Sequence, residues 1–225
     1  MRTLSIDLFS DVVCPWCHIG TAQLDTALAR LAAEDGVTAT VTYHPFLLDP
    51  STPPEGVDLV ARLRSKYGAD PRTMFARVEQ AGRNAGLALD FTRVTRTWPT
   101  DAAHTLLRHA LGRGTQRALA KALFAAHFDE ARNIADPDVL AEIAARHGFT
   151  VDEARALASD DEERATTRRL ATTATARGIR GVPFFVFDQR LALSGAQPPD
   201  VLVAAAREAL ATAAPSSEPS EGAAR

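Results

Sequence analysis

The sequence has only two cysteines, no run of basic residues and no long hydrophobic stretch, and each shortage excludes a class of protein. The 225 residues carry a net charge of −3 and a pI near 6.1, which argues against a nucleic-acid binder. No stretch approaches the roughly 20 apolar residues that span a bilayer. We therefore expect a soluble globular protein without nucleic-acid or membrane partners.

The first ten residues also lack the features of a targeting segment. They carry one positive charge and no long apolar region, so we expect the protein to remain in the cytoplasm. Structural disulfides are rare in that compartment, where paired cysteines are more often catalytic or metal-binding. The two cysteines are therefore the first candidates for function.

The hydrophobic pattern predicts two α/β ends around a helical middle. The predicted elements of the two ends are a strand at 3–9, a helix stopped by Gly36, a strand at 37–46, short strands at 182–187 and 190–194, and a helix at 200–212. Between 57 and 177 we find no convincing strand, but capping residues indicate about six helices. The predicted helix starts include Asp136 before a proline and the capping residues Thr150 and Ser159, each three residues ahead of a glutamate.

This order predicts an α/β protein with a thioredoxin-like fold and a large all-helical insertion. Residues 1–50 and 166–212 would form the two halves of the thioredoxin-like domain. Residues 51–165 would form an inserted helical lid. The small, polar residues 213–225 are predicted to be a disordered tail.

Both cysteines lie in the stretch SDVVCPWCHIG, at the predicted start of the first helix. Unpaired backbone N–H groups and the helix dipole favour a thiolate at Cys14, which is therefore the predicted nucleophile and should be solvent-accessible. Cys17, one turn later and more covered, is placed to attack a mixed disulfide on Cys14. Pro15 fits the first helical turn, and Trp16 is a bulky neighbour that leaves Cys14 as the reachable sulfur.

A redox pair is favoured over a zinc site or two incidental thiols. A zinc site needs two more ligands, and the sequence has no second cysteine pair. His18 adjoins Cys17, but adjacent residues on a helix point apart. A Cys-x-x-Cys beside a βαβ pattern is itself typical of redox proteins, so we expect no metal.

A second stretch, RGVPFFVF at 180–187, places a proline at the start of a predicted strand. Proline cannot donate a hydrogen bond to a sheet, so a central strand needs a special reason for it. A cis Val182–Pro183 bond would leave the Val182 backbone free to bind an extended peptide beside Cys14. A trans proline on an edge strand is the alternative.

With these stretches in place, the sequence resembles the DsbA family of thiol–disulfide oxidoreductases, and more narrowly its cytoplasmic FrnE-like branch. The matching stretches lie at 10–20, 53–59, 75–87, 181–187 and 194–202, in the same order as in the family. The resemblance implies that Cys14 is the nucleophile, that Cys17 is the resolving thiol, and that Pro183 is a cis-proline facing them.

Motif and resemblance together predict a dithiol–disulfide oxidoreductase, of the isomerase, reductase or oxidase type, acting on protein or peptide thiols. We expect no cofactor beyond the redox-active Cys14–Cys17 disulfide, with glutathione or thioredoxin as the reductant. The alternative is an enzyme on small aromatics, because kappa-type glutathione transferases and 2-hydroxychromene-2-carboxylate isomerases resemble this scaffold. Those enzymes usually have serine at the position of Cys14 and no resolving cysteine, so the intact pair favours the first function.

Three further residues are weaker candidates. Asp11, in the loop before the first cysteine, either holds that loop or tunes the cysteine pair, and a plain turn role is equally open. His18 would assist Cys14 if its ring pointed back at the sulfur. His104 has apolar helical neighbours, so a packed lid residue is favoured over an acid–base group.

Overall fold

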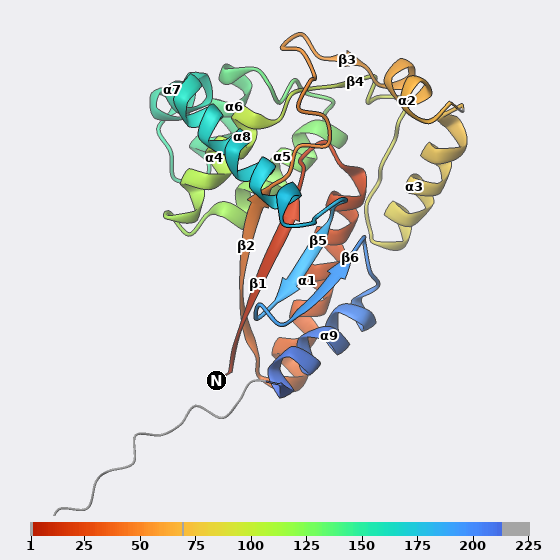
Figure 1. The fold of residues 1–225 in the computed structure, drawn as a ribbon, viewed down its shortest axis with the longest axis vertical. Helices are drawn as coiled ribbons and strands as arrows, with labels where there is room; N and C mark the ends of the chain where they lie inside the picture. The colour runs from red at the N-terminus through yellow and green to blue at the C-terminus, as the bar shows by residue number, and fades with distance from the viewer. Residues whose placement is uncertain (1, 69, 213–225) are drawn as a thin grey trace, which may run out of the picture.

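A four-stranded sheet lies at the centre of the part of the chain that the computed structural model describes, residues 2–68 and 70–212 (Figure 1). Its order is β2-β1-β5-β6, with β1 parallel to β2 and the other neighbours antiparallel. The strands are β1 (Thr3–Ser10), β2 (Thr38–Pro45), β5 (Phe184–Phe187) and β6 (Leu191–Ser194). All four were predicted from the sequence to within two residues at each end.

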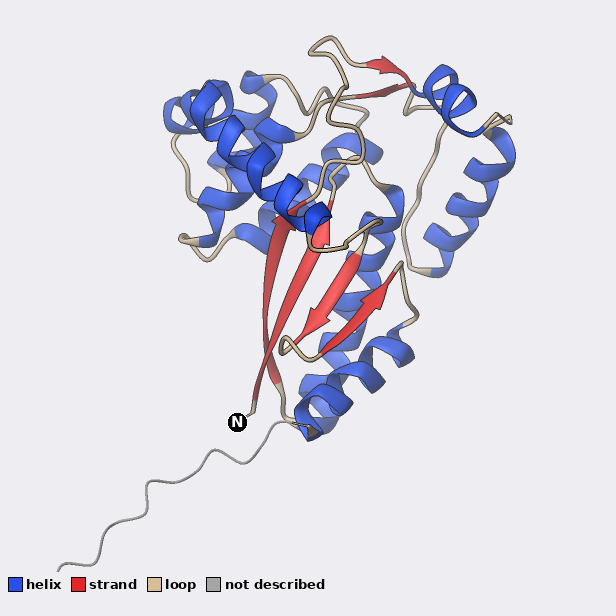
Figure 2. Cartoon of the chain, in the orientation of Figure 1, coloured by secondary structure: helices blue, strands red, loops and turns tan. Residues whose placement is uncertain are grey.

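Two helices pack on one face of this sheet, α1 (Pro15–Asp35) and α9 (Pro199–Ala211) (Figure 2). The alternating side chains Leu4, Ile6 and Leu8 of β1 join them in the main core and are at most 1% exposed. Burying each such side chain contributes about 1.5–3 kcal/mol. As predicted, α1 stops at Gly36, whose left-handed φ of 62° suits glycine. The predicted α/β fold class is therefore confirmed.

Between β2 and β5 the chain forms the predicted helical insertion, with two differences from the prediction. The described residues there form seven helices rather than six: α2 (Leu59–Tyr67), α3 (Arg72–Asn84), α4 (Asp101–Leu111), α5 (Gln116–Phe128), α6 (Pro137–Ala145), α7 (Val151–Ser159) and α8 (Asp161–Ala176). They also form two strands, β3 (Val57–Asp58) and β4 (Arg96–Thr97), which pair antiparallel. Two-residue strands are too short to show an alternating pattern, so they could not be predicted from the sequence.

Side-chain caps explain where several of these helices begin. Asp136 caps α6 and Thr150 caps α7, both as predicted. The predicted cap of α8 at Ser159 is wrong, because Asp160 accepts the N–H groups of Glu162 and Glu163 instead. Aspartate and serine cap about equally well, so spacing alone could not choose between neighbours.

The insertion is fixed to the sheet at two places. Gln116 at the start of α5 forms two hydrogen bonds with the backbone of Tyr43 on the edge strand β2, at 2.8 and 2.9 Å. On the second face of the sheet, Ala174 of α8 packs with Phe46 and Phe184 in a small separate core. Helix α8 thus crosses the predicted boundary at 165/166, and the domain division stays an interpretation. The predicted tail lies outside the described residues.

Two helices of the insertion, α2 and α3, lie apart from the others. They stand beside the N-terminal end of α1, whereas α4 to α8 gather near the end of β2 (Figure 1). None of the helices in the described ranges combines the length and apolar character that a membrane crossing requires.

Candidate active site

Cys14 is the residue that caps the N-terminus of α1. Its backbone is extended, with φ −90° and ψ 113°, and Pro15 begins the helix. The carbonyl of Cys14 accepts hydrogen bonds from the N–H groups of Cys17 and His18 at 3.0 and 3.2 Å. The backbone N–H of Cys14 donates to the backbone carbonyl of Asp11. The dipole of a 21-residue helix therefore ends at the first cysteine, as the sequence predicted.

Both cysteines are free thiols, and both are buried. Cys17 is 0% exposed and Cys14 only 4% exposed. The expectation that Cys14 is solvent-accessible is therefore wrong, although it remains the more exposed of the two. Burial raises the pKa of the Cys17 thiol well above its usual value, and contact with the Cys14 thiol adds to the effect. Cys17 consequently keeps its proton at neutral pH.

The Val182–Pro183 segment lies against Cys14, and its peptide bond is cis. The Cys14 Sγ donates a hydrogen bond of 3.8 Å to the carbonyl oxygen of Val182. Pro183 itself is buried and packs on α1 at Gly20, where a β-carbon would come within 2.8 Å of the proline ring. The following strand, β5, is internal to the sheet, so the edge-strand alternative does not apply.

Asp11 holds the loop before Cys14. Its side chain is 1% exposed, and its Oδ2 accepts the N–H of Leu48 at 2.7 Å. Its other oxygen, Oδ1, has no hydrogen-bond partner among the residues that the structure describes and lies 3.5 Å from Nε2 of His104. His104 is 3% exposed, in keeping with the packed lid residue that was favoured from the sequence. Of the roles left open for Asp11, holding the loop is the one that the hydrogen bond supports.

His18 does not supply a positive charge to Cys14. Its ring is 8% exposed and stacks on Phe124, 5.1 Å between centroids, with Phe128 beside it. Burial lowers the pKa of His18 from 6.5 to about 4, so the ring is neutral at neutral pH. A neutral ring cannot stabilise the Cys14 thiolate by its charge, so the assistance that a cationic His18 would give is absent. The sequence did not show this because both aromatic neighbours come from α5 in the insertion.

A cavity of about 530 Å³ lies between the cysteine motif and the helices α2 and α3. Cys14, Pro15, Trp16 and Val182 line one side of it. Asp11, a candidate from the sequence, also lines the cavity. The lining residues that the insertion supplies were not identified as site residues from the sequence, and they include Leu59, Leu63, Lys66, Tyr67, Met74, Phe75, Val78, Phe91, Trp98, His127 and Phe128. Two segments carried a signal through the resemblance: 53–59, which contains Leu59, and 75–87, which contains Phe75 and Val78.

His127 is a buried polar residue of the lining that the sequence did not identify. It is 3% exposed, and its Nδ1 has no hydrogen-bond partner among the described residues. Burial lowers the pKa of His127 to about 4, a shift that the nearby Asp11 carboxylate opposes. The histidine is therefore a neutral group in the cavity wall.

The chain matches the DsbA-like thioredoxin domain family over residues 5–207. It is similar to the crystal structure of a probable DsbA oxidoreductase from Streptomyces coelicolor, with 32% identity and a TM-score of 0.83 over 94% of this chain and 92% of that one. Two more distant structures share the fold. The cytosolic disulfide reductase DsbM from Pseudomonas aeruginosa, solved with GSH, has 20% identity, a TM-score of 0.56 and coverage of 92% and 96%. A 2-hydroxychromene-2-carboxylate isomerase has 14% identity, a TM-score of 0.65 and coverage of 92% and 96%.

Proposed function

The chain belongs to the DsbA-like thioredoxin domain family, and we propose that it is a dithiol–disulfide oxidoreductase whose redox pair is Cys14 and Cys17. One observation carries the proposal. Cys14 caps the first turn of α1 in the wall of a cavity, and Cys17 lies buried one turn later. This arrangement gives one sulfur access to a substrate and keeps the other for an intramolecular step.

The different burial of the two sulfurs sets the order of the reaction. The Cys14 thiolate attacks a substrate disulfide, forms a mixed disulfide and releases one substrate thiol. Cys17 then loses its proton, attacks the Cys14 sulfur and releases the second thiol, which leaves the enzyme disulfide. Because burial raises the pKa of Cys17, it does not compete for the substrate in the first step. The carbonyl of Val182 and the ring of Trp16 are the groups beside the mixed disulfide.

In a reducing cytoplasm the pair would rest mostly reduced, which suits reduction or isomerisation better than net oxidation. Regeneration then needs a thiol reductant, glutathione or thioredoxin. Cytoplasmic location and these reductants are parts of the same proposal. The likeness to the cytosolic disulfide reductase DsbM points the same way.

Serine variants of the two cysteines test the proposal. Purified protein is mixed with a disulfide substrate and reduced glutathione, and substrate reduction is followed over the uncatalysed rate. Wild type should accelerate it, Cys14→Ser should return it to background, and Cys17→Ser should accumulate a mixed disulfide at Cys14 that mass spectrometry detects. An unchanged rate in Cys14→Ser would show that the pair is structural.

The aromatic lining of the cavity favours one second candidate, an isomerase or glutathione transferase that works on small aromatics. The need for Cys17 distinguishes the two functions. Disulfide reduction requires it as the resolving thiol, whereas an isomerase or transferase needs one activating group and no resolving thiol. Glutathione conjugation or isomerisation that survives in Cys17→Ser, together with loss of disulfide reduction, would support this candidate.

A further inference from the structure

The apolar face of α2 lines the cavity, and among the described residues of this helix Leu59 alone also packs against the main core. Leu59, Leu63 and Tyr67 recur every four residues, so they share one side of the helix, and all three line the cavity. No residue of α2 is fully buried. An amphipathic helix normally covers its apolar stripe against neighbouring side chains. In this protein the apolar stripe of α2 is therefore available to contact a ligand in the cavity.

Aromatic rings form the wall next to this stripe. Phe75 of α3 stacks on Phe91, with 4.6 Å between ring centroids and an angle of 3° between planes. Phe91 in turn meets Phe128 edge to face at 6.3 Å. Trp98 and Trp16 complete the aromatic part of the lining. Such a wall is suited to bind an aromatic or other large apolar group.

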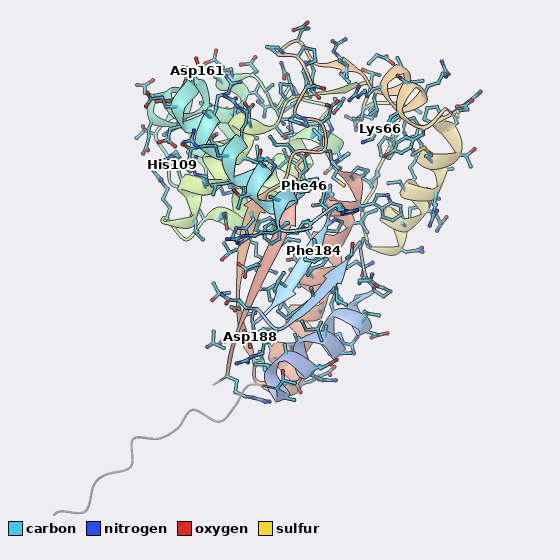
Figure 3. All side chains as sticks on the ribbon, in the orientation of Figure 1. Phe46, Lys66, His109, Asp161, Phe184 and Asp188 are labelled. Atoms are coloured by element: carbon cyan, nitrogen blue, oxygen red, sulfur yellow. The ribbon has the colours of Figure 1, made fainter. Side chains whose placement is uncertain are left out.

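The lining holds three cations, Arg62, Lys66 and Arg180, and two carboxylates, Asp11 and Asp49, so positive charge is in excess by one. Arg62 is paired with Asp49. Lys66 and Arg180 are exposed cations with no ion pair among the described residues. Lys66 lies on the side of α2 that faces the rest of the molecule (Figure 3). Two unpaired cations at the edge of an apolar cavity favour a ligand that carries a negative group.

The nucleophilic sulfur is reached from this cavity. Cys14 is 4% exposed and is one of the lining residues, so a substrate sulfur has to enter the cavity to react. A folded protein could present a disulfide there only on a segment that reaches into the cavity. The volume of about 530 Å³ instead lies within the range of small-molecule sites, roughly 300–1,000 Å³.

We propose that the substrate is a low-molecular-weight disulfide that carries an aromatic or similarly large apolar group and a carboxylate. The inference rests on the proposed redox function and replaces the protein or peptide substrates expected from the sequence. The apolar group lies on the stripe of α2 and the ring of Phe75, and the carboxylate lies near Lys66 and Arg180. This arrangement brings the substrate sulfur to Cys14.

The reaction balances with a thiol as the reductant. The reduced enzyme and one disulfide give the Cys14–Cys17 disulfide and two substrate thiols, with both enzyme thiol protons passing to the products. Two molecules of a low-molecular-weight thiol then reduce the enzyme and leave as their own disulfide. Two electrons therefore move from the thiol reductant to the substrate in each cycle.

A single-turnover experiment tests the substrate class. Reduced enzyme is mixed with one disulfide, quenched with acid, treated with maleimide and weighed by mass spectrometry to count free thiols. The probes are the disulfide of mercaptomethylbenzoic acid, its carboxamide analogue, cystamine, and insulin as a protein disulfide. Each rate is divided by the rate of the same probe with dithiothreitol. We expect the normalised rate of the aromatic acid to exceed those of cystamine and insulin at least ~10-fold.

Two substitutions locate the selectivity in the cavity. Leu63→Trp fills the space beside the stripe and should remove most of the aromatic advantage while the cystamine rate changes less than about 2-fold. Leu170→Trp, at a 44% exposed position of α8, is the matched control and should change neither rate. Lys66→Glu should slow the aromatic acid more than its carboxamide, which isolates the charge.

The outcomes separate this inference from the proposed function. If insulin reacts as fast as the aromatic acid, or if Leu63→Trp slows all probes equally, the substrate class is wrong but the redox function stands. If no probe oxidises the wild-type pair faster than it oxidises dithiothreitol, and Cys14→Ser behaves like wild type, the proposed function falls as well.

Discussion

The contact between Gly20 and Pro183 sets how closely α1 approaches the segment beside Cys14, and Gly20→Ala tests it. A β-carbon at position 20 would lie 2.8 Å from Pro183 Cγ and 3.3 Å from Phe185 Cζ. Neither neighbour moves easily, because the proline ring is part of the backbone and Phe185 is 0% exposed. The substitution therefore forces α1 and this segment apart.

Two opposing effects decide the magnitude. Alanine in a helix interior is favoured over glycine by about 1 kcal/mol. An extra carbon in a packed core is unfavourable by about 1–3 kcal/mol when its neighbours are rigid. We expect the packing term to prevail, so Gly20→Ala should lower the free energy of unfolding by about 1 kcal/mol. It should also slow disulfide reduction, because the Val182 carbonyl shifts relative to the Cys14 sulfur.

Gly82→Ala in α3 is the matched control. Its β-carbon would lie 3.0 Å from Leu89 Cδ1, the far end of a side chain that can rotate away. Helix propensity should then dominate, and the variant should unfold at the same or a slightly higher urea concentration than wild type. Urea denaturation of both variants measures the difference. The reasoning fails if Gly20→Ala is stabilised as much as Gly82→Ala.

Three other predictions concern the buried polar groups. The pKa values of His18 and His127 lie near 4 in the folded protein, below the value of 6.5 in the unfolded chain. Between pH 4 and pH 6.5, each histidine therefore binds a proton when the protein unfolds. Stability should therefore fall as the pH is lowered from 6.5 to about 4, by up to roughly 3 kcal/mol for each histidine, as measured by urea denaturation. Asp11→Ala should lower stability by about 1–3 kcal/mol because it leaves a backbone N–H unpaired, whereas Asp11→Asn keeps an acceptor and should retain most of it. Maleimide should label Cys14 before Cys17, and labelling in the opposite order would reverse their proposed roles.

The features that the sequence predicted are those that depend on neighbouring residues. Alternation in β1 and glycine at position 36 act within a few residues, so the first strand and the end of α1 could be read directly. The placement of Cys14 at a helix start follows in the same way from Pro15 and the strand before it. The chemistry of the pair was therefore predictable, because spacing alone sets the order of the two sulfurs along the helix.

The features that the sequence missed depend on contacts across the chain. Cys14 is buried beside a segment far along the chain, since its sulfur contacts the Val182 carbonyl, and no local pattern near position 14 records this contact. The neutral state of His18 comes from Phe124 and Phe128, more than a hundred residues away in sequence. The position of His18 next to Cys17 suggested a positive charge near the thiols, but burial against these distant side chains keeps the ring neutral.

The cysteine pair and most of the cavity lining come from different parts of the chain. The proposed sulfur chemistry needs only a helix start, a second cysteine one turn later and the Val182 carbonyl, all supplied by the sheet-containing halves. Most of the shape of the cavity comes from α2, α3 and the segment around Trp98 in the insertion, and its two exposed cations are Lys66 in the insertion and Arg180 in the second half. Substitutions at Leu63 or Lys66 should therefore change which disulfide is reduced while leaving the redox pair intact. Substitutions at Cys14 should abolish reduction of every disulfide alike.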